Sequence, residues 1–254
     1  MEAQFEMLSE MAKNGDKLNF GQDFFVKFYQ AFLYSDRWQQ YFKGVGTTLL
    51  VTAIALVLGV VLGAIVAMIR VGYAQQKPHH RNPVLGIFNA VAQVYVTVIR
   101  GTPMMVQLLI MSMVIFASSR NFTMVGALAL GINSGAYVSE IIRGGLMAVD
   151  PGQMEAGRSL GLNYMTTMVV IIIPQAIRAV LPALGNEFII LLKDTSLITT
   201  IGGKELLYAA QGIMNRTYEA MFPLLGVALI YLILVMLFTW LLSKFERRLA
   251  QSDR

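Results

Sequence analysis

The sequence predicts an all-α protein, built as an integral membrane helical bundle of five transmembrane helices. Of its 254 residues, 56% are hydrophobic and only 14% are charged, and the mean hydropathy is +0.60. A chain of this composition is too apolar and too poor in charge for an ordinary soluble domain. The apolar residues gather in long runs that polar segments separate. We therefore expect a multi-pass membrane protein whose charged residues mostly mark the connections between spans.

Residues 1–42 precede the first long apolar run and are predicted to form an amphipathic leader at the membrane surface, ahead of a transmembrane domain at residues 43–254. Aromatic and aliphatic side chains recur in the second half of this leader: Phe24, Phe25, Phe28, Tyr29, Phe32, Leu33 and Tyr34. Trp38 and Tyr41 are expected at the membrane interface. The first residues mix acids with bases and contain no short apolar core, so we expect no cleavable secretory signal.

The first transmembrane helix is predicted at residues 45–69, which carry no charge. Gly59 and Gly63 form a small-xxx-small pattern that lets another helix approach closely, and a packing role is favoured over a gating role. The polar connection that follows contains adjacent His79 and His80. Because neighbouring side chains point apart on a helix and no carboxylate lies nearby, we interpret this connection as a solvated basic loop and not as a metal site.

The second crossing is predicted to be interrupted. Residues 84–99 are apolar, the sequence Arg-Gly-Thr-Pro follows at residues 100–103, and a further apolar run extends from Met104 to Ala117. Glycine and proline predict a kink at residues 101–103, after which the helix completes the crossing.

The third span is predicted at residues 123–148, and it carries a polar stripe. Asn133, Tyr137 and Glu140 recur at helical spacing, so their side chains share one face. In lipid such a face must contact protein or water. Glu140 is placed to pair with Arg143, whereas Asn133, deeper in the span, is the better candidate for lining a passage.

The fourth span is predicted from about Tyr164 to Leu192, with prolines inside it and two carboxylates near its end. A buried charge without compensation would cost roughly 3 kcal/mol or more in this setting. Glu187 and Asp194 are seven residues apart, so they differ by only about 20° around a helix and by about 10 Å along it. Two carboxylates on one face predict an electronegative site.

The remaining residues hold one more span. Residues 195–221 are of mixed polarity and are expected outside the membrane, with partial re-entry at Leu197–Ile201 and a short helix from Lys204 to about Gln211. The last span is predicted from Phe222 to Leu242.

The connection between the third and fourth spans, residues 150–163, has the features of a short surface helix. Asp150 is placed to cap its start with Pro151 in the first turn, and Gly161 with Asn163 is placed to stop it. A polar helix that leaves the bilayer between two spans is available to a partner outside the membrane.

This segment resembles the EAA loop of ABC importer permeases, which reads Glu-Ala-Ala, three residues, Gly, nine residues and Ile-x-Leu-Pro. The chain has Glu155-Ala156-Gly157, three residues, Gly161, nine residues, and then Ile-Ile-Ile-Pro at residues 171–174. The two departures, Gly for Ala and Ile for Leu, keep each residue small or aliphatic. RGTP at residues 100–103, LGNEF at 184–188 and KDTSL at 193–197 are similar to the polar amino acid branch of this family.

The resemblance implies a type I ABC importer permease fold and several partners. The short helix would be a cytoplasmic coupling helix that docks on a separate ATP-binding subunit through Glu155, Ala156, Gly157, Arg158 and Gly161. A second permease subunit, identical or related, and an extracytoplasmic substrate-binding protein that docks near residues 195–221 are also implied. The chain would lie in the bacterial cytoplasmic membrane with its N-terminus outside and its C-terminus in the cytoplasm. Lysine and arginine counts on the two sides are nearly equal and decide little about this orientation.

The residues predicted to bind substrate are Glu187, Asp194, Asn133 and Arg100. Neutral residues are common in the family at the place of Glu187, so a carboxylate there indicates a cationic amino acid such as arginine, lysine or histidine. Two structural alternatives stay open. Glu187 could pair with a base on a neighbouring helix, and Asp194 with Lys193 could belong to an ion-pair network at the membrane edge. The substrate could then be another polar amino acid, such as glutamine, glutamate or cystine.

Motifs that the chain lacks narrow its chemistry. It contains no phosphate-binding G-x-x-x-x-G-K-[ST] sequence, so its energy must come from a partner. It has no cysteine, which excludes thiol catalysis and cysteine-ligated metals. We expect a transport subunit and not an enzyme, without catalytic residues, cofactor or metal. The net charge of +5 is scattered through loops and favours anionic lipid over nucleic acid as a partner.

A competing class is an ion-coupled secondary carrier in which Glu140, Glu187 and Asp194 form a cation path. Secondary carriers are often built from two inverted repeats. Five spans do not divide into two equal halves, so the sequence favours the importer.

Overall fold

The computed structural model describes residues 1–76 and 81–251, and these residues form helices joined by short connections, without a strand. The basic loop predicted around His79 and His80 lies outside the described residues. Within the described ranges, five helical segments are long and apolar enough to cross a membrane: Tyr34–Ala74, Pro83–Gly101, Phe122–Ala148, Tyr164–Ile201 and Met221–Arg248. The predicted all-α class with five spans is confirmed.

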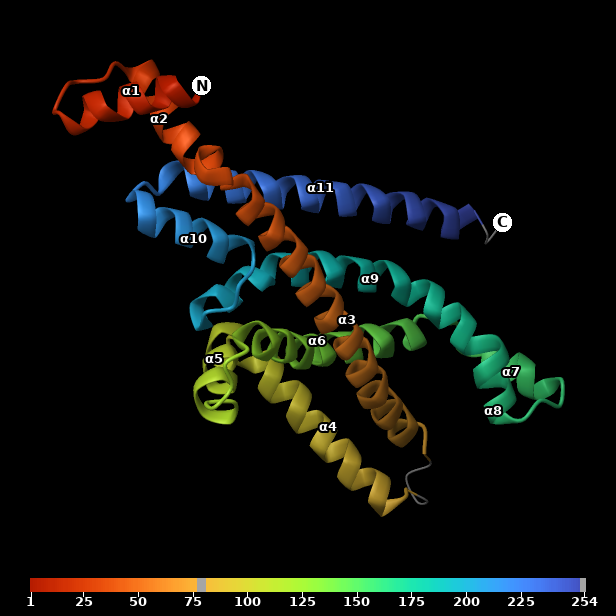
Figure 1. Ribbon diagram of the computed structural model, residues 1–254. Helices are drawn as coiled ribbons and strands as arrows, with labels where there is room; N and C mark the ends of the chain where they lie inside the picture. The colour runs from red at the N-terminus through yellow and green to blue at the C-terminus, as the bar shows by residue number, and fades with distance from the viewer. Residues whose placement is uncertain (77–80, 252–254) are drawn as a thin grey trace.

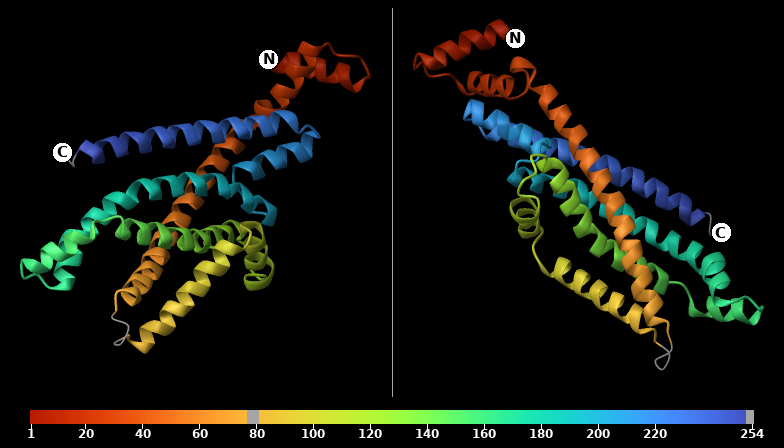
Figure 2. Two further views of the ribbon diagram at one scale, coloured as in Figure 1. Left: turned by 180° about the vertical axis from the view of Figure 1, so that it is seen from behind. Right: turned by 60° about the horizontal axis from the view of Figure 1, so that its bottom comes forward.

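The spans run between two ends of an elongated molecule (Figures 1 and 2). One end, here called the N-terminal end, carries α1 (Glu2–Lys13), α2 (Phe20–Phe32), α5 (Met104–Ile110) and α10 (Leu206–Thr217). The other end, here called the α7 end, carries α7 (Pro151–Ser159), α8 (Tyr164–Thr167) and the C-terminus. The two candidate surfaces for partners therefore lie at opposite ends of the spans.

The central pair of helices is α3 (Trp38–Ala74) with α6 (Phe122–Met147), and small residues let them approach closely. A Cβ at Gly59 would lie 2.7 Å from the Ser134 Oγ atom, and a Cβ at Gly63 would lie 2.6 Å from Val138 Cγ1. Glycine on α6 makes room for α3 in the same way, because a Cβ at Gly131 would lie 2.6 Å from Leu58 Cδ2. Close contact of this kind stabilises helix association by van der Waals packing, because the hydrophobic effect does not drive helices together inside lipid. The packing role predicted for the two α3 glycines is confirmed.

The predicted kink in the second crossing is a full break. α4 (Pro83–Gly101) ends where Thr102 and Pro103 adopt extended conformations, and α5 then starts at Met104 as a separate helix. A π-helical turn, η3 (Met111–Ile115), continues α5. α4 alone has the length of a span, and Met104–Ile115 forms a separate, shorter apolar helix. The interruption predicted at residues 101–103 is confirmed, while completion of the crossing by Met104–Ala117 stays a prediction. Two consecutive extended residues redirect the chain more than a kink would.

The fourth span is built from three helical pieces. After α8, a π-helical turn, η4 (Met168–Ile172), leads into α9 (Ile173–Asp194), which has Pro174 in its first turn and Pro182 inside it. Because Pro174 has no N–H to donate, it interrupts the regular helical hydrogen bonds, and the π-helical turn lies directly before it. The chain then tightens into a 3₁₀ helix, η5 (Thr195–Ile201), which covers the re-entrant stretch predicted from the sequence.

The main apolar core lies between α3, α5, α6, α9 and η5. Ile198 of η5 is fully buried in it beside Val51, Leu108 and Leu130. A second, smaller core joins α3, α10 and α11 (Met221–Gln251) around Tyr41, Leu206 and Ile213. Both cores contain residues of α3, which therefore links the two halves of the bundle.

The leader forms a helical hairpin, of which the sequence predicted only the second helix. α1 packs on α2 through Phe5, whose ring centroid lies 4.8 Å from that of Tyr29. α2 packs on α11, with the ring centroids of Phe24 and Phe222 5.1 Å apart. The helix α3 begins at Trp38 and runs without interruption through the predicted domain boundary at residue 42.

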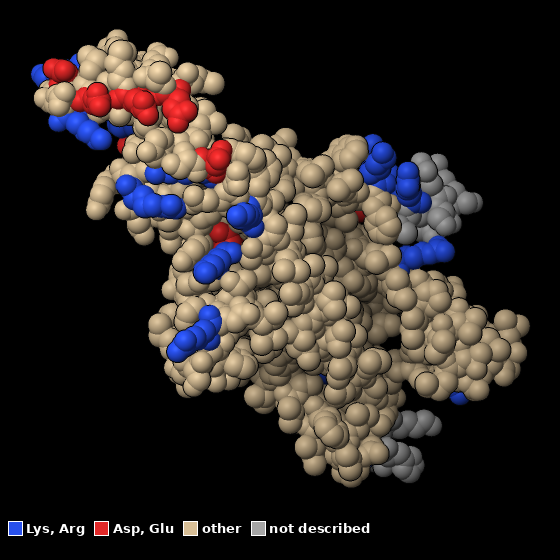
Figure 3. Space-filling model, viewed as in Figure 1, with Lys and Arg blue, Asp and Glu red and all other residues tan. Residues whose placement is uncertain are grey.

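Charged side chains are distributed unevenly over the surface. On the face shown in Figure 3 they gather at the N-terminal end, on the hairpin and on the surface below it, and near the end of the last helix, and a broad uncharged surface lies between. Many large apolar side chains of the spans are exposed, including Val57, Val94 and Leu232. An uncharged band between two charged ends is expected of a protein whose middle faces lipid.

Candidate functional site

The short helix α7 is built as the sequence predicts. The Asp150 carboxylate accepts a hydrogen bond from the Gly152 N–H at 2.8 Å, and Pro151 opens the helix. Beyond its last turn, Gly161 adopts a left-handed φ of +84°, which favours glycine. Asn163 does not continue this stop; its side chain caps α8 by accepting from the Thr166 N–H.

The predicted coupling residues divide by burial. Glu155, Ala156 and Arg158 are exposed at the α7 end of the molecule, whereas Gly157 is buried. A Cβ at Gly157 would lie 2.5 Å from the Thr167 Cγ2 atom. Glycine at the second Ala position of the motif therefore permits close packing of α7 on α8. Beside α7, a hollow of about 520 Å³ is lined by residues that include Gln75, Leu146 and Arg158.

Glu187 lies inside the bundle, where α9 packs on α6. Glu187 is only 6% exposed, and the Ser134 hydroxyl donates a hydrogen bond to its Oε1 atom at 2.7 Å. Among residues 1–76 and 81–251, no lysine or arginine forms an ion pair with Glu187 or with Asp194. The alternative in which a base neutralises Glu187 therefore receives no support from the described residues, whereas the charge of Lys193 acts on Asp194 without a close ion pair, so that alternative stays open. Asp194 is half-buried at the end of α9.

Asn133 is the neighbour of Ser134 on α6 and contacts a different helix. Its Nδ2 atom donates to the Gln107 Oε1 atom at 2.9 Å. The Gln107 Nε2 atom in turn donates to the carbonyl oxygens of Ile99 and Thr102, at 2.8 and 3.1 Å. Ile99 lies in the last turn of α4 and Thr102 lies in the break, so Gln107 of α5 supplies a donor to backbone carbonyls that have no helical partner there.

Arg100 lies in the last turn of α4, next to this break. Its guanidinium carbon is 5.2 Å from the centre of the Tyr137 ring on α6, a cation–π arrangement. α6 thus presents Asn133, Ser134 and Tyr137 toward α5, α9 and α4 respectively. Three of the four predicted substrate residues are connected through this helix, and Asp194 lies two turns beyond Glu187. The sequence pattern missed Ser134 and Gln107 as partners, because an isolated serine or glutamine gives no periodic signal.

Glu140, the third member of the predicted stripe, is an ion-pair partner. It accepts from Arg143 Nη2 at 2.7 Å, as predicted, and also from Arg70 of α3, which the sequence did not indicate. With two bases paired to it, Glu140 links α3 to α6 toward the α7 end.

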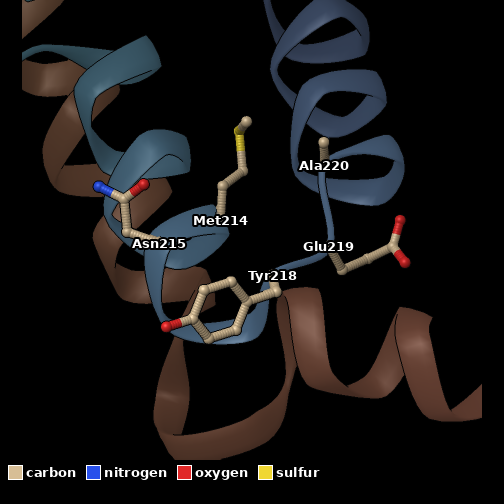
Figure 4. Close-up of a pocket in the computed structure, with 5 residues that line it drawn as sticks. All are labelled: Met214, Asn215, Tyr218, Glu219 and Ala220. Atoms are coloured by element: carbon tan, nitrogen blue, oxygen red, sulfur yellow. The ribbon is translucent and has the colours of Figure 1, made fainter.

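A second hollow lies at the N-terminal end, beside the turn between α10 and α11. It has a volume of about 430 Å³ and is lined by Met214, Asn215, Tyr218, Glu219 and Ala220 (Figure 4). Tyr218 is 95% exposed and has a φ of +55°, a conformation that non-glycine residues rarely adopt. A strained, exposed aromatic residue is a candidate contact for a partner.

A hydrogen bond and an ion pair hold this turn against the leader. Arg216 Nη2 donates to the Gln40 Oε1 atom at 2.7 Å, and Lys27 Nζ lies 3.7 Å from Glu219. A hydrogen bond to Asp23, at 2.8 Å, together with the charges of Asp23 and Glu219, raises the pKa of Lys27 above its usual value. The turn is therefore fixed from two sides before any partner arrives.

Comparison with known proteins shows similarity along most of the chain. Residues 84–251 match the family described as the inner membrane component of binding-protein-dependent transport systems. A putative glutamine transport system permease protein, GlnP of Rickettsia bellii, is 38% identical over 83% of this chain and 93% of that protein. The arginine transport system permease protein ArtQ of Bacillus subtilis is 32% identical over the same shares of the two chains.

Solved structures resemble the fold as well. A chain from a crystal structure of an amino acid ABC transporter with histidines is 40% identical, has a TM-score of 0.74, and is matched over 83% of this chain and 94% of that one. An inward-facing MetNI methionine ABC transporter has a TM-score of 0.70 at 19% identity, over 85% of this chain and 99% of that one. Together with the helical architecture, the family match confirms the predicted resemblance. The chain belongs to the inner membrane components of binding-protein-dependent transport systems, with the fold of the type I ABC importer permeases.

Proposed function

We propose that this chain is the permease subunit of an ATP-driven importer for cationic amino acids, with arginine, lysine and histidine as the substrates to test. The observation that carries the proposal is the Glu187 carboxylate, which is buried, receives one hydrogen bond from Ser134 and forms no ion pair with a described base. A buried carboxylate is costly unless a cation or hydrogen-bond donors compensate it. A cationic side chain entering the bundle would provide that compensation.

The other predicted residues extend the site. Asp194, about two helical turns along α9, would offer a second carboxylate at about 10 Å. Asn133 and Arg100, joined through Gln107 and the α4–α5 break, would contact the α-amino and α-carboxylate groups that all amino acids share. In this arrangement Glu187 selects the side chain, and Asn133 with Arg100 recognises the common part of the substrate.

A second candidate substrate is glutamine. It is favoured by the name of several relatives, among them the Rickettsia bellii protein at 38% identity, whereas the Bacillus subtilis arginine relative favours the cationic proposal. The two substrates make opposite demands on Glu187, because an amide side chain brings no charge to balance a buried carboxylate.

The two ends of the molecule would face different partners. We place α7 in the cytoplasm, where Glu155, Ala156 and Arg158 would contact a separate ATP-binding subunit. We place the N-terminal end outside, where Tyr218 and the hollow beside it would contact the substrate-binding protein. The leader would lie at the outer membrane surface, and a second permease subunit would complete the passage, because five spans enclose little by themselves.

The substrate proposal is tested by ligand-dependent thermal stability of the purified complex. A ligand that binds only the folded form stabilises it by RT ln(1 + [L]/Kd), about 2.7 kcal/mol at a concentration 100 times Kd. We expect arginine, lysine or histidine at millimolar concentration to raise the melting temperature, and Glu187→Gln to abolish the shift. Glu219→Gln, at the other candidate surface, is the matched control and should keep it. Equal shifts by glutamine in the intact and Glu187→Gln complexes would show that the substrate proposal is wrong.

A further inference from the structure

Glu205 is a buried carboxylate that the transport proposal does not use. It is 1% exposed and lies between η5 and the start of α10. Three donors from three elements converge on it. The Thr199 hydroxyl of η5 and the Tyr208 N–H of α10 donate to Oε1, and the Tyr231 hydroxyl of α11 donates to Oε2 at 2.7 Å. Because carboxylate oxygens accept hydrogen bonds, one side chain satisfies a donor from each of these three elements.

The Thr199 hydroxyl differs from the other hydroxyl groups of η5. Thr195, Ser196 and Thr200 each donate to a backbone carbonyl three residues earlier, at 2.7 to 2.8 Å. Thr199 donates instead to Glu205, six residues later. Its hydroxyl therefore joins η5 to the N-cap of the following helix. Of the other three, Thr195 also lies 3.4 Å from the Tyr231 hydroxyl of α11, and Thr200 lies 3.4 Å from the Met105 sulfur of α5.

The backbone next to Glu205 is held by α3. The Leu206 N–H donates to the buried Thr48 hydroxyl at 3.3 Å, and a Cβ at Gly44 would lie 2.7 Å from the Leu206 Cα atom. Glu205 is therefore held by α3 through its backbone neighbour and by α11 through Tyr231, whose hydroxyl also lies 3.4 Å from that of Thr195 in η5. A carboxylate with a fixed position can in turn set the position of the segment that donates to it.

The segment held in this way occupies the interior of the bundle. η5 directly follows Asp194, and Ile198 and Ile201 insert between α3, α5 and α6. A Cβ at Gly126 of α6 would lie 2.5 Å from the Ile198 Cγ2 atom, so the fit has little spare room. η5 fills the bundle between Asp194 and the N-terminal end.

We propose that Glu205 is a positioning residue for transport, which holds the Thr195–Ile201 segment in place so that it closes the passage on the side of the N-terminal end. The proposal rests on the proposed function, since it presumes that substrate passes Glu187 and Asp194. Loss of the Thr199–Glu205 hydrogen bond then shifts η5 toward positions that leave the passage open. Glu205 itself contacts no substrate.

The test compares two threonines of one helix. Thr199→Val removes the donor to Glu205 with little change of shape, and Thr200→Val removes a hydroxyl whose acceptors are the Leu197 carbonyl and the Met105 sulfur. The full complex is placed in liposomes preloaded with labelled arginine and glutamine, and efflux without ATP is measured. We expect efflux on the order of tenfold above wild type in Thr199→Val, because losing one hydrogen bond to a carboxylate changes the equilibrium between closed and open η5 by about that factor. In Thr200→Val we expect wild-type efflux.

Hydrogen exchange of the amides at residues 195–201 is measured on the same complexes. It should accelerate in Thr199→Val and not in Thr200→Val, and this readout does not depend on which substrate is carried. Unchanged exchange and unchanged efflux in a fully assembled Thr199→Val complex would overturn the proposal. If the wild-type complex imports neither amino acid with ATP, the proposed function fails, while accelerated exchange alone would still support the positioning role.

A second pair of variants is available if Thr199→Val does not assemble. Gly126→Ala displaces Ile198 by contact and leaves the Glu205 hydrogen bonds in place, and Gly144→Ala on the same helix meets no atom within 4 Å. We expect increased efflux in Gly126→Ala only. Equal efflux in the two alanine variants would show that the position of η5 does not close the passage.

Discussion

Ser134 is the residue at which helix packing and the candidate chemistry meet. On one side it faces Gly59 of α3, and on the other its hydroxyl donates to Glu187. The sequence indicated Gly59 from its spacing and Glu187 from its charge. It could not indicate Ser134, because a single small polar residue fits the packing face of a membrane helix whether or not it has a partner.

Gly59→Ala should therefore affect stability and ligand binding together. The added Cβ would lie 2.7 Å from the Ser134 Oγ atom, and overpacking in a tight core costs about 1–3 kcal/mol. We expect a lower melting temperature of the complex and a smaller shift on adding arginine. Gly46→Ala on the same helix, where a Cβ meets nothing within 4 Å, should leave both values close to wild type. Equal effects of the two substitutions would mean that the Gly59–Ser134 contact is unimportant.

At the scale of elements, the sequence predicted what depends on length and on local stop signals. Apolar runs of bilayer length gave the spans, and Asp150, Pro151 and Gly161 gave α7 its ends. Elements fixed by distant contacts were missed or misjudged. α1 depends on the contact of Phe5 with α2, and the hydrogen bonds that join Gln107 of α5 to Ile99 at the end of α4 and to Thr102 in the break need the folded chain.

The α7 element makes a prediction about coupling. Gly161 has a φ of +84°, and a residue with a Cβ pays about 1–2 kcal/mol in a left-handed conformation, whereas asparagine tolerates it better. We expect Gly161→Ala, like Glu155→Ala, to lower amino acid uptake while ATP hydrolysis and assembly persist, and Gly161→Asn to retain more uptake than Gly161→Ala. The ratio of uptake to ATP hydrolysed in liposomes measures this. Wild-type uptake in both alanine variants would remove the coupling role from α7.

The whole molecule separates its two candidate partner surfaces by the length of the spans. α7, with Glu155 and Arg158, lies at one end, and the α10–α11 turn with Tyr218 lies at the other (Figure 1). Between them, α3 and α6 run in close contact and carry the residues that join the site to both ends. α7 itself packs on α8 and η4, which continue through α9 into η5, and α3 and α6 pack against α9. We therefore expect a displacement of α7 to reach η5 along this continuous segment, beside the close-packed pair α3 and α6.

The orientation of this axis in the membrane is a prediction for the intact cell. The chain contains no cysteine, so single cysteines can be introduced without removing any native one. Asn14→Cys and Tyr218→Cys, both exposed at the N-terminal end, should react with a membrane-impermeant maleimide in intact cells. Ser159→Cys, exposed at the end of α7, should react only after the membrane is permeabilised. The reverse pattern would place the N-terminus in the cytoplasm, and α7 could then not contact a cytoplasmic ATPase.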